Sequence, residues 1–186
     1  MRNLSGKRVA ILATDGYDQS ELEIPLARLK EAGAHVDVVS LKPGVIKGWH
    51  HHDWGRSMDV DKVLDEVSPN DYDALVLPGG QMNPDLLRQE SDAIAFIRGF
   101  WKQNKVIAAI CHAPWLLIEA GIVRGRNVTS YLSIRTDVIN AGGIWHDEDV
   151  VVDQGLVTSR KPTDLESFCL KTAEEIAEGK HERRAA

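Results

Sequence analysis

Short apolar runs alternate along the chain with longer segments of helical periodicity. The runs are "RVAILA", "HVDVVS", "DALVLP" and "VIAAI". Two of them, "ALVL" and "VIAAI", are continuously apolar, which is typical of parallel strands that are buried on both faces. The alternation predicts βαβ units around a parallel sheet, with these two runs as central strands.

Four helical segments are expected between and after these strands. A leucine-rich segment follows the first run and stops at Gly33, a residue type common just past a helix end. The others cover about 84–103, the stretch between Cys111 and Gly121, and about 163–178. Before the last one, "EDVVVDQGLVTS" has a turn signal between two β-rich runs and predicts a hairpin.

Composition bounds the class of protein. The 186 residues, 43% of them hydrophobic, suit one α/β domain spanning 1–186, with a core of about 8–178 and a basic tail at 179–186. A net charge of −6 argues against nucleic acid as a partner, and no segment approaches the length of a membrane span. Two cysteines are too few for a disulfide framework and no secretory signal is evident, so we expect free thiols and a cytoplasmic location.

Polar and glycine residues follow three of the predicted strands. In open α/β sheets, ligands bind beyond the carboxyl ends of the strands, so these positions are candidates for a site. They are Asp15, Asp18 and Glu21 after the first strand, Gly79 and Gly80 after the third, and Cys111 and His112 after the fourth.

Cys111 falls at a turn from strand to helix, which resembles the elbow that exposes a nucleophile above an α/β sheet. Free N–H groups and the helix dipole there favour a thiolate near neutral pH. The backbone N–H groups of His112 and Gly80 could form an oxyanion hole, and Gly79 and Gly80 would let a substrate approach closely. A small, buried structural cysteine is the alternative, and spacing alone leaves both open.

Five motifs occur in an order that resembles a known family. They are "ELEIP", "ALVLPGGQMNPDLLR", "VIAAICHAPWLLIEAG", "VTSYLSIRTDVINAGG" and "VVVDQGLVTSRKPTDL". From about Arg8 to Ile176 the chain resembles the PfpI-type intracellular proteases of the DJ/PfpI superfamily, which is similar to the class I glutamine amidotransferases. The resemblance implies a flavodoxin-like, three-layer α/β/α sandwich with a mainly parallel central sheet.

The resemblance also implies a catalytic set. Cys111 matches the nucleophile, His112 the proton acceptor that follows it, and Glu21 the glutamate whose carboxyl group lies against the sulfur. Such a carboxyl group should be protonated and donate a hydrogen bond, because two adjacent negative charges are unfavourable. Read without the family, Glu21 is an ordinary charge on the first turn of a helix.

Asp85 falls where the PfpI proteases place a glutamate that reaches the histidine of a neighbouring subunit. The implied assembly is a homo-oligomer, a dimer or hexamer, with the site at a subunit interface. This sequence departs from the pattern there, with a shorter carboxylate and what looks like one extra residue in "QMNPD". A charge at a helix start after Pro84 is the alternative interpretation of Asp85.

Three further features give weaker signals. Asp18, Gly79 and Arg160 are expected to line a substrate pocket, although Asp18 and Arg160 also suit ordinary surface positions. The stretch 146–148, His-Asp-Glu, has the type of residues that completes the triad of glutamine amidotransferases, but it lies where PfpI proteins carry no triad. The stretch 49–54, "WHHHDW", reads as a loop near the pocket, because three consecutive histidines cannot all point one way and no Cys/His pair accompanies them.

We therefore expect a cysteine-dependent hydrolase without a metal or cofactor, acting on small carbonyl or peptide substrates. The resemblance implies peptidase activity, removal of early glycation adducts and cofactor-free conversion of glyoxals, in the context of stress protection. All three can begin when a thiolate attacks an electrophilic carbon. The alternative is a redox-sensing stress protein or chaperone, in which Cys111 is oxidised instead of acting in catalysis.

Overall fold

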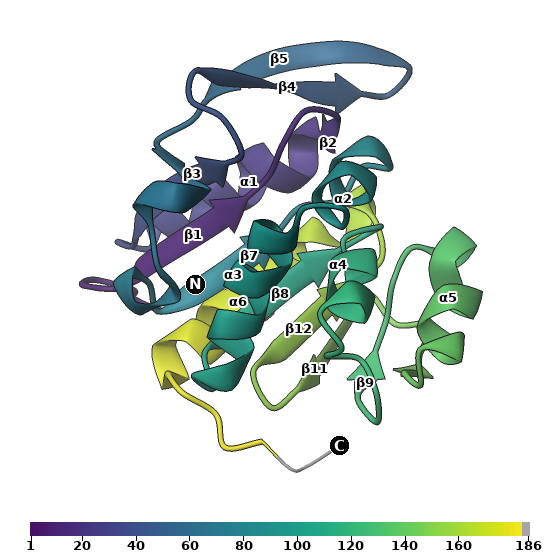
Figure 1. Cartoon of the computed structure of the whole chain (residues 1–186). Helices are drawn as coiled ribbons and strands as arrows, with labels where there is room; N and C mark the ends of the chain where they lie inside the picture. Colours follow the sequence, from purple (N-terminus) through teal and green to yellow (C-terminus); the bar gives the residue numbers. More distant parts are fainter. Residues whose placement is uncertain (184–186) are drawn as a thin grey trace.

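The computed structural model describes residues 1–183, and its centre is a seven-stranded sheet (Figure 1). The strand order is β11-β12-β8-β7-β1-β3-β6, and every pair is parallel except β11 with β12. The strands are β1 (Arg8–Leu12), β3 (His35–Ser40), β6 (Lys62–Val63), β7 (Ala74–Leu77), β8 (Val106–Ile110), β11 (Val150–Asp153) and β12 (Leu156–Ser159). The predicted mainly parallel sheet is confirmed, and β7 and β8 lie at its middle as expected.

Helices cover both faces of the sheet. α1 (Gln19–Glu31) and α6 (Leu165–Glu178) pack on one face, whereas α3 (Ser91–Lys102) and α4 (Pro114–Glu119) pack on the other, with α2 (Met82–Leu87) beside α4. Alternate residues of β1 enter the two resulting cores: Val9 and Ile11 face α1 and α6, and Ala10 and Leu12 face the opposite layer. The three-layer α/β/α sandwich is therefore confirmed.

The segment expected to form one helix at 84–103 forms two. α2 ends before Arg88, the backbone of Glu90 is extended, and α3 begins at Ser91. Arg88, Gln89 and Glu90 are all compatible with a helix, so the periodic pattern runs through the break and gives no sign of it. The expected hairpin is confirmed, because β11 and β12 pair around the turn at Gln154 and Gly155, both of which have positive φ.

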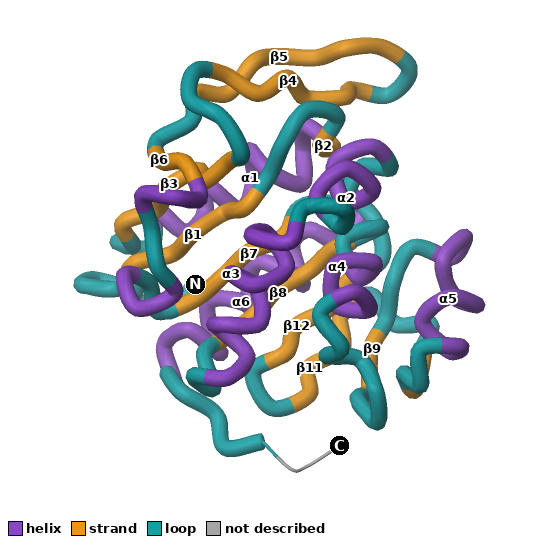
Figure 2. Tube along the Cα trace, viewed as in Figure 1, coloured by secondary structure: helices purple, strands orange, loops and turns teal. Residues whose placement is uncertain are grey.

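The sequence predicts a loop for the stretch 49–54 with its three histidines. The stretch forms the turn end of a β-hairpin instead. β4 (Val45–His50) and β5 (Asp53–Asp59) pair antiparallel. β4 also pairs in parallel with the short β2 (Tyr17–Asp18), and the three strands form a separate sheet in the order β2-β4-β5. Figure 2 shows this hairpin standing apart from the central sheet. His51 has a φ of 55° at the turn, a conformation that the apolar pattern of the strands cannot reveal.

Most of the remaining short elements lie beside β11, at one edge of the sheet, and η4 connects β12 to α6. They are β9 (Asn127–Val128), the 3-10 turn η3 (Leu132–Ile134), α5 (Arg135–Asn140), β10 (Ile144–Trp145) and the 3-10 turn η4 (Pro162–Asp164). Two further 3-10 turns, η1 (Leu64–Glu66) and η2 (Pro69–Asp71), lead from β6 to β7. Within residues 1–183, no helix combines the length and apolar character needed to cross a membrane. The last residues of the expected basic tail, from Arg184 on, lie outside the described chain.

Candidate active site

Cys111 occupies a strained elbow between β8 and α4. Its φ is 64°, in the left-handed region that non-glycine residues rarely adopt. The elbow is held on both sides, because the Cys111 N–H donates to the Ser159 carbonyl over 3.0 Å and the Tyr131 N–H donates to the Cys111 carbonyl over 2.8 Å. Strain that the surrounding structure maintains in this way is found mainly at functional sites.

Glu21 lies fully buried against the sulfur of Cys111, as the resemblance implied. Its Oε2 accepts a hydrogen bond from the Gly79 N–H over 2.9 Å, whereas Oε1 has no hydrogen-bond partner. Burial raises the pKa of this carboxyl group well above its usual range, and the nearby charge of Asp18 adds to the effect. A protonated Glu21 would offer one hydrogen-bond donor, which would give this otherwise unpartnered buried carboxyl oxygen a physical role.

The pKa of Cys111 is raised, the direction opposite to the one expected from the sequence. Burial of the thiol is the largest cause and the charge of Glu21 is the second, while the N–H groups of Gly80 and His112 oppose them. The helix α4 has only six residues and begins at Pro114, beyond the elbow, so its dipole contributes little. A thiol in these surroundings needs a base to take its proton when it reacts.

Two glycines close the space around the sulfur. A Cβ on Gly79 would lie 2.6 Å from both the Cβ of Cys111 and Oε2 of Glu21. Gly80 has a φ of 79°, and a Cβ there would lie 2.4 Å from the Gly16 carbonyl oxygen. The N–H groups of Gly80 and His112 both act on the sulfur, so the two predicted oxyanion donors converge on one atom. Their role in binding an oxyanion stays a prediction.

His112 contacts the thiol with one ring nitrogen and a hydroxyl group with the other. Its Nδ1 is 3.2 Å from Sγ of Cys111, and its Nε2 is 3.1 Å from Oγ of Ser133. Tyr131 stacks on the imidazole at 4.7 Å between ring centroids, and Trp115 meets it edge-on at 5.3 Å. Burial lowers the pKa of His112, so the neutral, proton-accepting form is favoured.

Ser133 is the contact that the sequence did not indicate. It lies in the 3-10 turn η3 and is exposed to solvent. Ser133 falls inside the motif "VTSYLSIRTDVINAGG", but a serine in a turn is usually a surface residue, and no spacing rule connects it to a histidine 21 positions earlier. Only the path of the chain around the elbow brings the two side chains together.

Asp85 does not contact His112 among residues 1–183 of a single chain. It is exposed in the first turn of α2, and its carbonyl oxygen accepts a hydrogen bond from the Gln89 side chain. Its expected partner, the histidine of another subunit, is not present. The proposed reach across an interface therefore stays a prediction.

Of the weaker pocket residues, Asp18 lies beside Gly79, because its N–H donates to the Gly79 carbonyl over 3.2 Å, whereas Arg160 is engaged elsewhere. The Asp18 carboxylate caps α1 by accepting from the N–H groups of Ser20 and Glu21, so it has a structural use. Arg160 forms ion pairs with Asp147 and Asp164, which offset its charge. Arg160 does line a hollow of about 300 Å³, together with Ser130, Tyr131, Leu132, Trp145, Asp147 and Lys161. Tyr131 thus connects this hollow with the ring of His112.

The remaining motifs lie outside this arrangement. His146 contacts the Asn127 side chain over 2.9 Å, and Asp147 is engaged by Arg160, so neither is free for a triad. In the described part of the chain, the grouping with ligand atoms close enough for a metal ion is Glu175, Glu178 and His181, and it does not include the three consecutive histidines.

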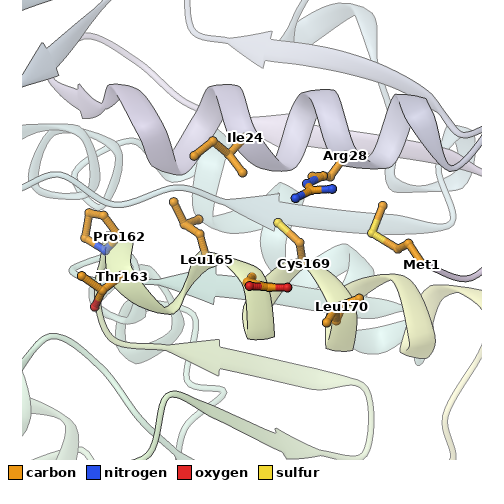
Figure 3. A pocket seen from close by; sticks show the side chains of 9 residues that line it. Met1, Ile24, Arg28, Pro162, Thr163, Leu165, Cys169 and Leu170 are labelled. Carbon is orange, nitrogen blue, oxygen red and sulfur yellow. The ribbon is translucent and has the colours of Figure 1, made fainter.

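A second hollow, of about 330 Å³, lies between α1 and α6 (Figure 3). It is bordered by Cys169 and Arg28 and contains none of the predicted catalytic residues. Burial raises the pKa of Cys169 to about 12, so this second thiol is suited to packing and not to chemistry.

The structure is a three-layer α/β/α protein with a strained strand-to-helix turn at Cys111, and comparison with known proteins specifies the family. The DJ-1/PfpI family model matches residues 7–175. A deglycase of Thermococcus kodakarensis is 46% identical over 158 residues, which are 85% of this chain and 92% of the relative. YraA of Bacillus subtilis, named as a candidate cysteine protease, is 40% identical over 163 residues, which are 87% of this chain and 94% of the relative.

Solved structures give the same assignment. The crystal structure of Drosophila melanogaster DJ-1beta has a TM-score of 0.83 at 29% identity and covers 92% of this chain and 94% of its own. The chain belongs to the DJ-1/PfpI family. The names of its relatives support a hydrolase-type enzyme.

Proposed function

We propose that the chain is a cysteine-dependent hydrolase of the PfpI type, acting on acyl or carbonyl-derived substrates through Cys111. The observation that carries the proposal is the strained elbow, where the sulfur lies 3.2 Å from Nδ1 of His112 and beside the buried carboxyl group of Glu21. A nucleophile, an adjacent base and a buried acid together suit attack on an electrophilic carbon.

In the proposed reaction, Nδ1 of His112 takes the thiol proton as the sulfur forms a bond to the carbonyl carbon. The electron pair of the C=O double bond moves to the oxygen, which the N–H groups of Gly80 and His112 would stabilise; that both groups lower the pKa of the Cys111 thiol supports this role. Protonated Glu21 donates a further hydrogen bond. For an acyl substrate, His112 then returns its proton to the leaving amine or thiol, and water hydrolyses the thioester to the acid and the free thiol.

A glyoxal has no leaving group: His112 gives its proton to the oxyanion, and the C–H proton of the attacked carbon moves to the neighbouring carbonyl carbon by way of the same base while the hydroxyl proton moves to that carbonyl's oxygen. Water then hydrolyses the resulting hydroxyacyl thioester to the hydroxy acid and the free thiol.

We propose removal of early glycation adducts and conversion of glyoxals as the main activities. Peptidase activity is proposed as a further activity of the same site. The deglycase name of the T. kodakarensis relative supports the first, and the cysteine-protease name of YraA supports the last. The proposed cellular role is protection against reactive carbonyl compounds.

Parallel assays of Cys111→Ser on methylglyoxal, on methylglyoxal-modified peptides and on unmodified peptides test this function. We expect turnover of at least one substrate class by the wild type and its loss in the variant. Cys169→Ser is the matched control, because it removes the other thiol at a site away from Glu21 and His112. Full activity of Cys111→Ser on every substrate that the wild type turns over would remove Cys111 from the mechanism.

The redox-sensing alternative predicts a different result. Graded peroxide followed by intact-mass measurement would add two oxygens selectively to Cys111 in a protein without turnover. Both roles require the Cys111 thiol to lose its proton, because the thiolate is the form that attacks and the form that oxidises, so turnover is the result that separates them.

We further propose that the protein works as a homo-oligomer, a dimer or hexamer. Several apolar side chains stand exposed around η3, α5 and β10, close to the candidate site. They are Tyr131, Leu132, Ile139 and Ile144. A neighbouring copy that covered them would also be placed to bring Asp85 toward the site, as the resemblance implies.

A further inference from the structure

His112 has a partner for Nε2 within its own chain, the hydroxyl group of Ser133 at 3.1 Å. In enzymes that use a histidine as a base, the ring nitrogen away from the nucleophile is usually held by a third group. That group fixes the orientation of the ring and decides which nitrogen carries the proton. Here Ser133 occupies this position.

The tautomer of His112 follows from the two contacts. Sγ of Cys111 lies 3.2 Å from Nδ1, and the thiol can give up its proton to Nδ1 only if that nitrogen has a free lone pair. The neutral ring then carries its hydrogen on Nε2, which can donate it to Oγ of Ser133. In the other tautomer, Nε2 would accept from the Ser133 hydroxyl group and Nδ1 would carry a hydrogen, so the ring could not take the thiol proton; only the tautomer with Nε2–H combines the Ser133 contact with a base at Nδ1.

We infer that Ser133 is the positioning residue of His112, accepting a hydrogen bond from Nε2–H and so keeping Nδ1 free to take the proton of Cys111. This inference rests on the proposed function of Cys111 and His112. Ser133 does not touch the reacting atoms and acts through the imidazole ring.

Apart from Cys111 and Ser133, the contacts of the His112 imidazole in the described part of the chain are with aromatic rings and not with charged groups. Tyr131 stacks on one face, and Trp115 meets the ring from another direction. Two charged groups contact Trp115 instead: Asp137 accepts from its Nε1 at 2.8 Å, and Arg88 lies 5.4 Å from its ring. No ion pair of His112 occurs within residues 1–183, so a neutral hydroxyl group holds the ring where a triad uses a carboxylate.

A neutral acceptor has a chemical consequence. A carboxylate at Nε2 would stabilise the imidazolium and raise the pKa of His112, whereas a hydroxyl group leaves the neutral ring favoured in its buried setting. His112 therefore remains a proton acceptor in a site where the thiol also starts out protonated. A carboxylate from Asp85 of another copy would have to displace Ser133 from Nε2 or act through it.

The test uses three substitutions of Ser133 and two measurements. Because Ser133 is exposed, we expect the variants to fold as the wild type does, which the melting temperature checks. The measurements are the pH profile of kcat/KM with methylglyoxal and the pH profile of Cys111 alkylation by iodoacetamide. Thr136→Ala is the matched control, since it removes an exposed hydroxyl group from the adjacent helix α5.

Ser133→Ala should lower kcat and the alkylation rate by roughly 3- to 10-fold, the effect of one neutral hydrogen bond, with little change in KM. Ser133→Thr should restore both rates, because it keeps the hydroxyl group. Ser133→Asp should move the acid limb of both profiles upward by about one pH unit, because a carboxylate at Nε2 favours the imidazolium. A purely structural role would not shift the limb.

Unchanged rates and profiles in Ser133→Ala and Ser133→Asp would overturn the inference. It would also be overturned if Asp85→Asn gave the losses expected of Ser133→Ala while Ser133→Ala did not, because Asp85 of a neighbouring copy would then hold His112. The alkylation profile does not depend on turnover. If Cys111→Ser kept full activity, the proposed function would fail. The alkylation rates of the Ser133 variants would still show whether Ser133 holds His112 in the orientation that takes the thiol proton.

Discussion

At the scale of single residues, the candidate site depends on a carboxyl group and a thiol that are both buried in their neutral forms. Glu21 is fully buried with one unpartnered oxygen, and the sulfur of Cys111 is almost equally enclosed. Two negative charges in this space would repel each other and lose their hydration. The arrangement therefore favours protonated Glu21 as a donor and neutral His112 as the base.

Glu21→Gln should make stability less sensitive to pH. The folded-state pKa of Glu21 is raised above its ordinary value of 4.5, so its contribution to stability is full below that pH and is lost as the pH rises toward the folded-state pKa. Glutamine keeps an acceptor for Gly79 and a donor in place of the acid proton. The variant should gain up to about 1.4 kcal/mol over the wild type for each pH unit in this window.

Urea unfolding of both proteins at several pH values between 5 and 8 measures this difference. Glu31→Gln, an exposed position at the end of the same helix, controls for the loss of one carboxylate. A constant difference between wild type and Glu21→Gln across this range would show that Glu21 is ionised in the folded protein.

Gly79→Ala should reduce both stability and activity. The new Cβ would lie 2.6 Å from the Cβ of Cys111 and 2.7 Å from the Ile110 carbonyl, neither of which can move without shifting the elbow. Overpacking of this kind costs about 1–3 kcal/mol, and the melting temperature reports it. Gly121→Ala is the comparison: its Cβ would meet nothing within 4 Å but its φ is 74°, so it shows the loss from backbone strain away from the site, whereas Gly79 has no positive φ. Retained turnover and an unchanged melting temperature in Gly79→Ala would contradict the packing argument.

Some residues of the site could be expected from the sequence and others could not. Cys111, Glu21 and the glycines each follow a buried strand, so sheet topology alone brings them to one edge. Ser133 belongs to a turn without periodicity and reaches His112 only through the path of η3. The pKa of Cys111 was expected in the wrong direction because the depth of its burial depends on packing from several elements.

At the scale of elements, α1 places Glu21, and Asp18 fixes where α1 begins. The Asp18 carboxylate accepts from the N–H groups of Ser20 and Glu21 over 3.0 and 3.2 Å. The same residue pairs through its backbone with Trp49 of β4, so the start of α1 lies beside the turn end of the outer hairpin. The N-cap hydrogen bonds give Asp18 a structural role that does not require contact with a substrate.

Asp18→Ala should destabilise the protein by about 1 kcal/mol, the usual effect of removing an N-cap. Asp18→Asn should retain most of the stability and activity, because the amide oxygen can accept the same hydrogen bonds. Chemical denaturation and turnover assays of both variants check this expectation. Normal stability with strongly reduced activity in Asp18→Asn would favour the substrate-pocket interpretation instead.

The strands and the first and last helices were predictable because each buries a continuous or periodic apolar face. The break between α2 and α3 and the β4–β5 hairpin were not. Arg88, Gln89 and Glu90 all accept helical geometry, and the turn at His51 depends on a left-handed backbone that histidine adopts only occasionally. Tertiary contacts decide both points.

At the scale of the whole molecule, exposed apolar side chains gather near the site. Leu132 is 66% exposed, Ile144 50% and Ile139 45%, and all belong to adjoining elements on the β9 side of the sheet. Clustered exposure of this kind commonly marks a protein interface. It supports an assembly in which another copy covers the surroundings of His112.

Leu132→Glu should weaken that assembly, because a charge would be buried without a partner at the interface. Light scattering coupled to size exclusion should find a dimer or larger species for the wild type and smaller species for the variant. Val45→Glu, at a similarly exposed position (59%) on the outer hairpin, is the control and should leave the assembly intact. A wild type that is monomeric at all concentrations would contradict the proposed assembly and remove Asp85 from the site.

The central claim is that the thiol of Cys111 carries out the chemistry, and stoichiometric labelling tests it most directly. The native protein is treated with increasing iodoacetamide, the label is mapped by mass spectrometry, and residual turnover of methylglyoxal or its peptide adducts is measured. We expect turnover to fall in proportion to the label on Cys111 and to reach zero at one label per chain, with Cys169 unmodified. Full labelling of Cys111 with turnover retained would contradict the account.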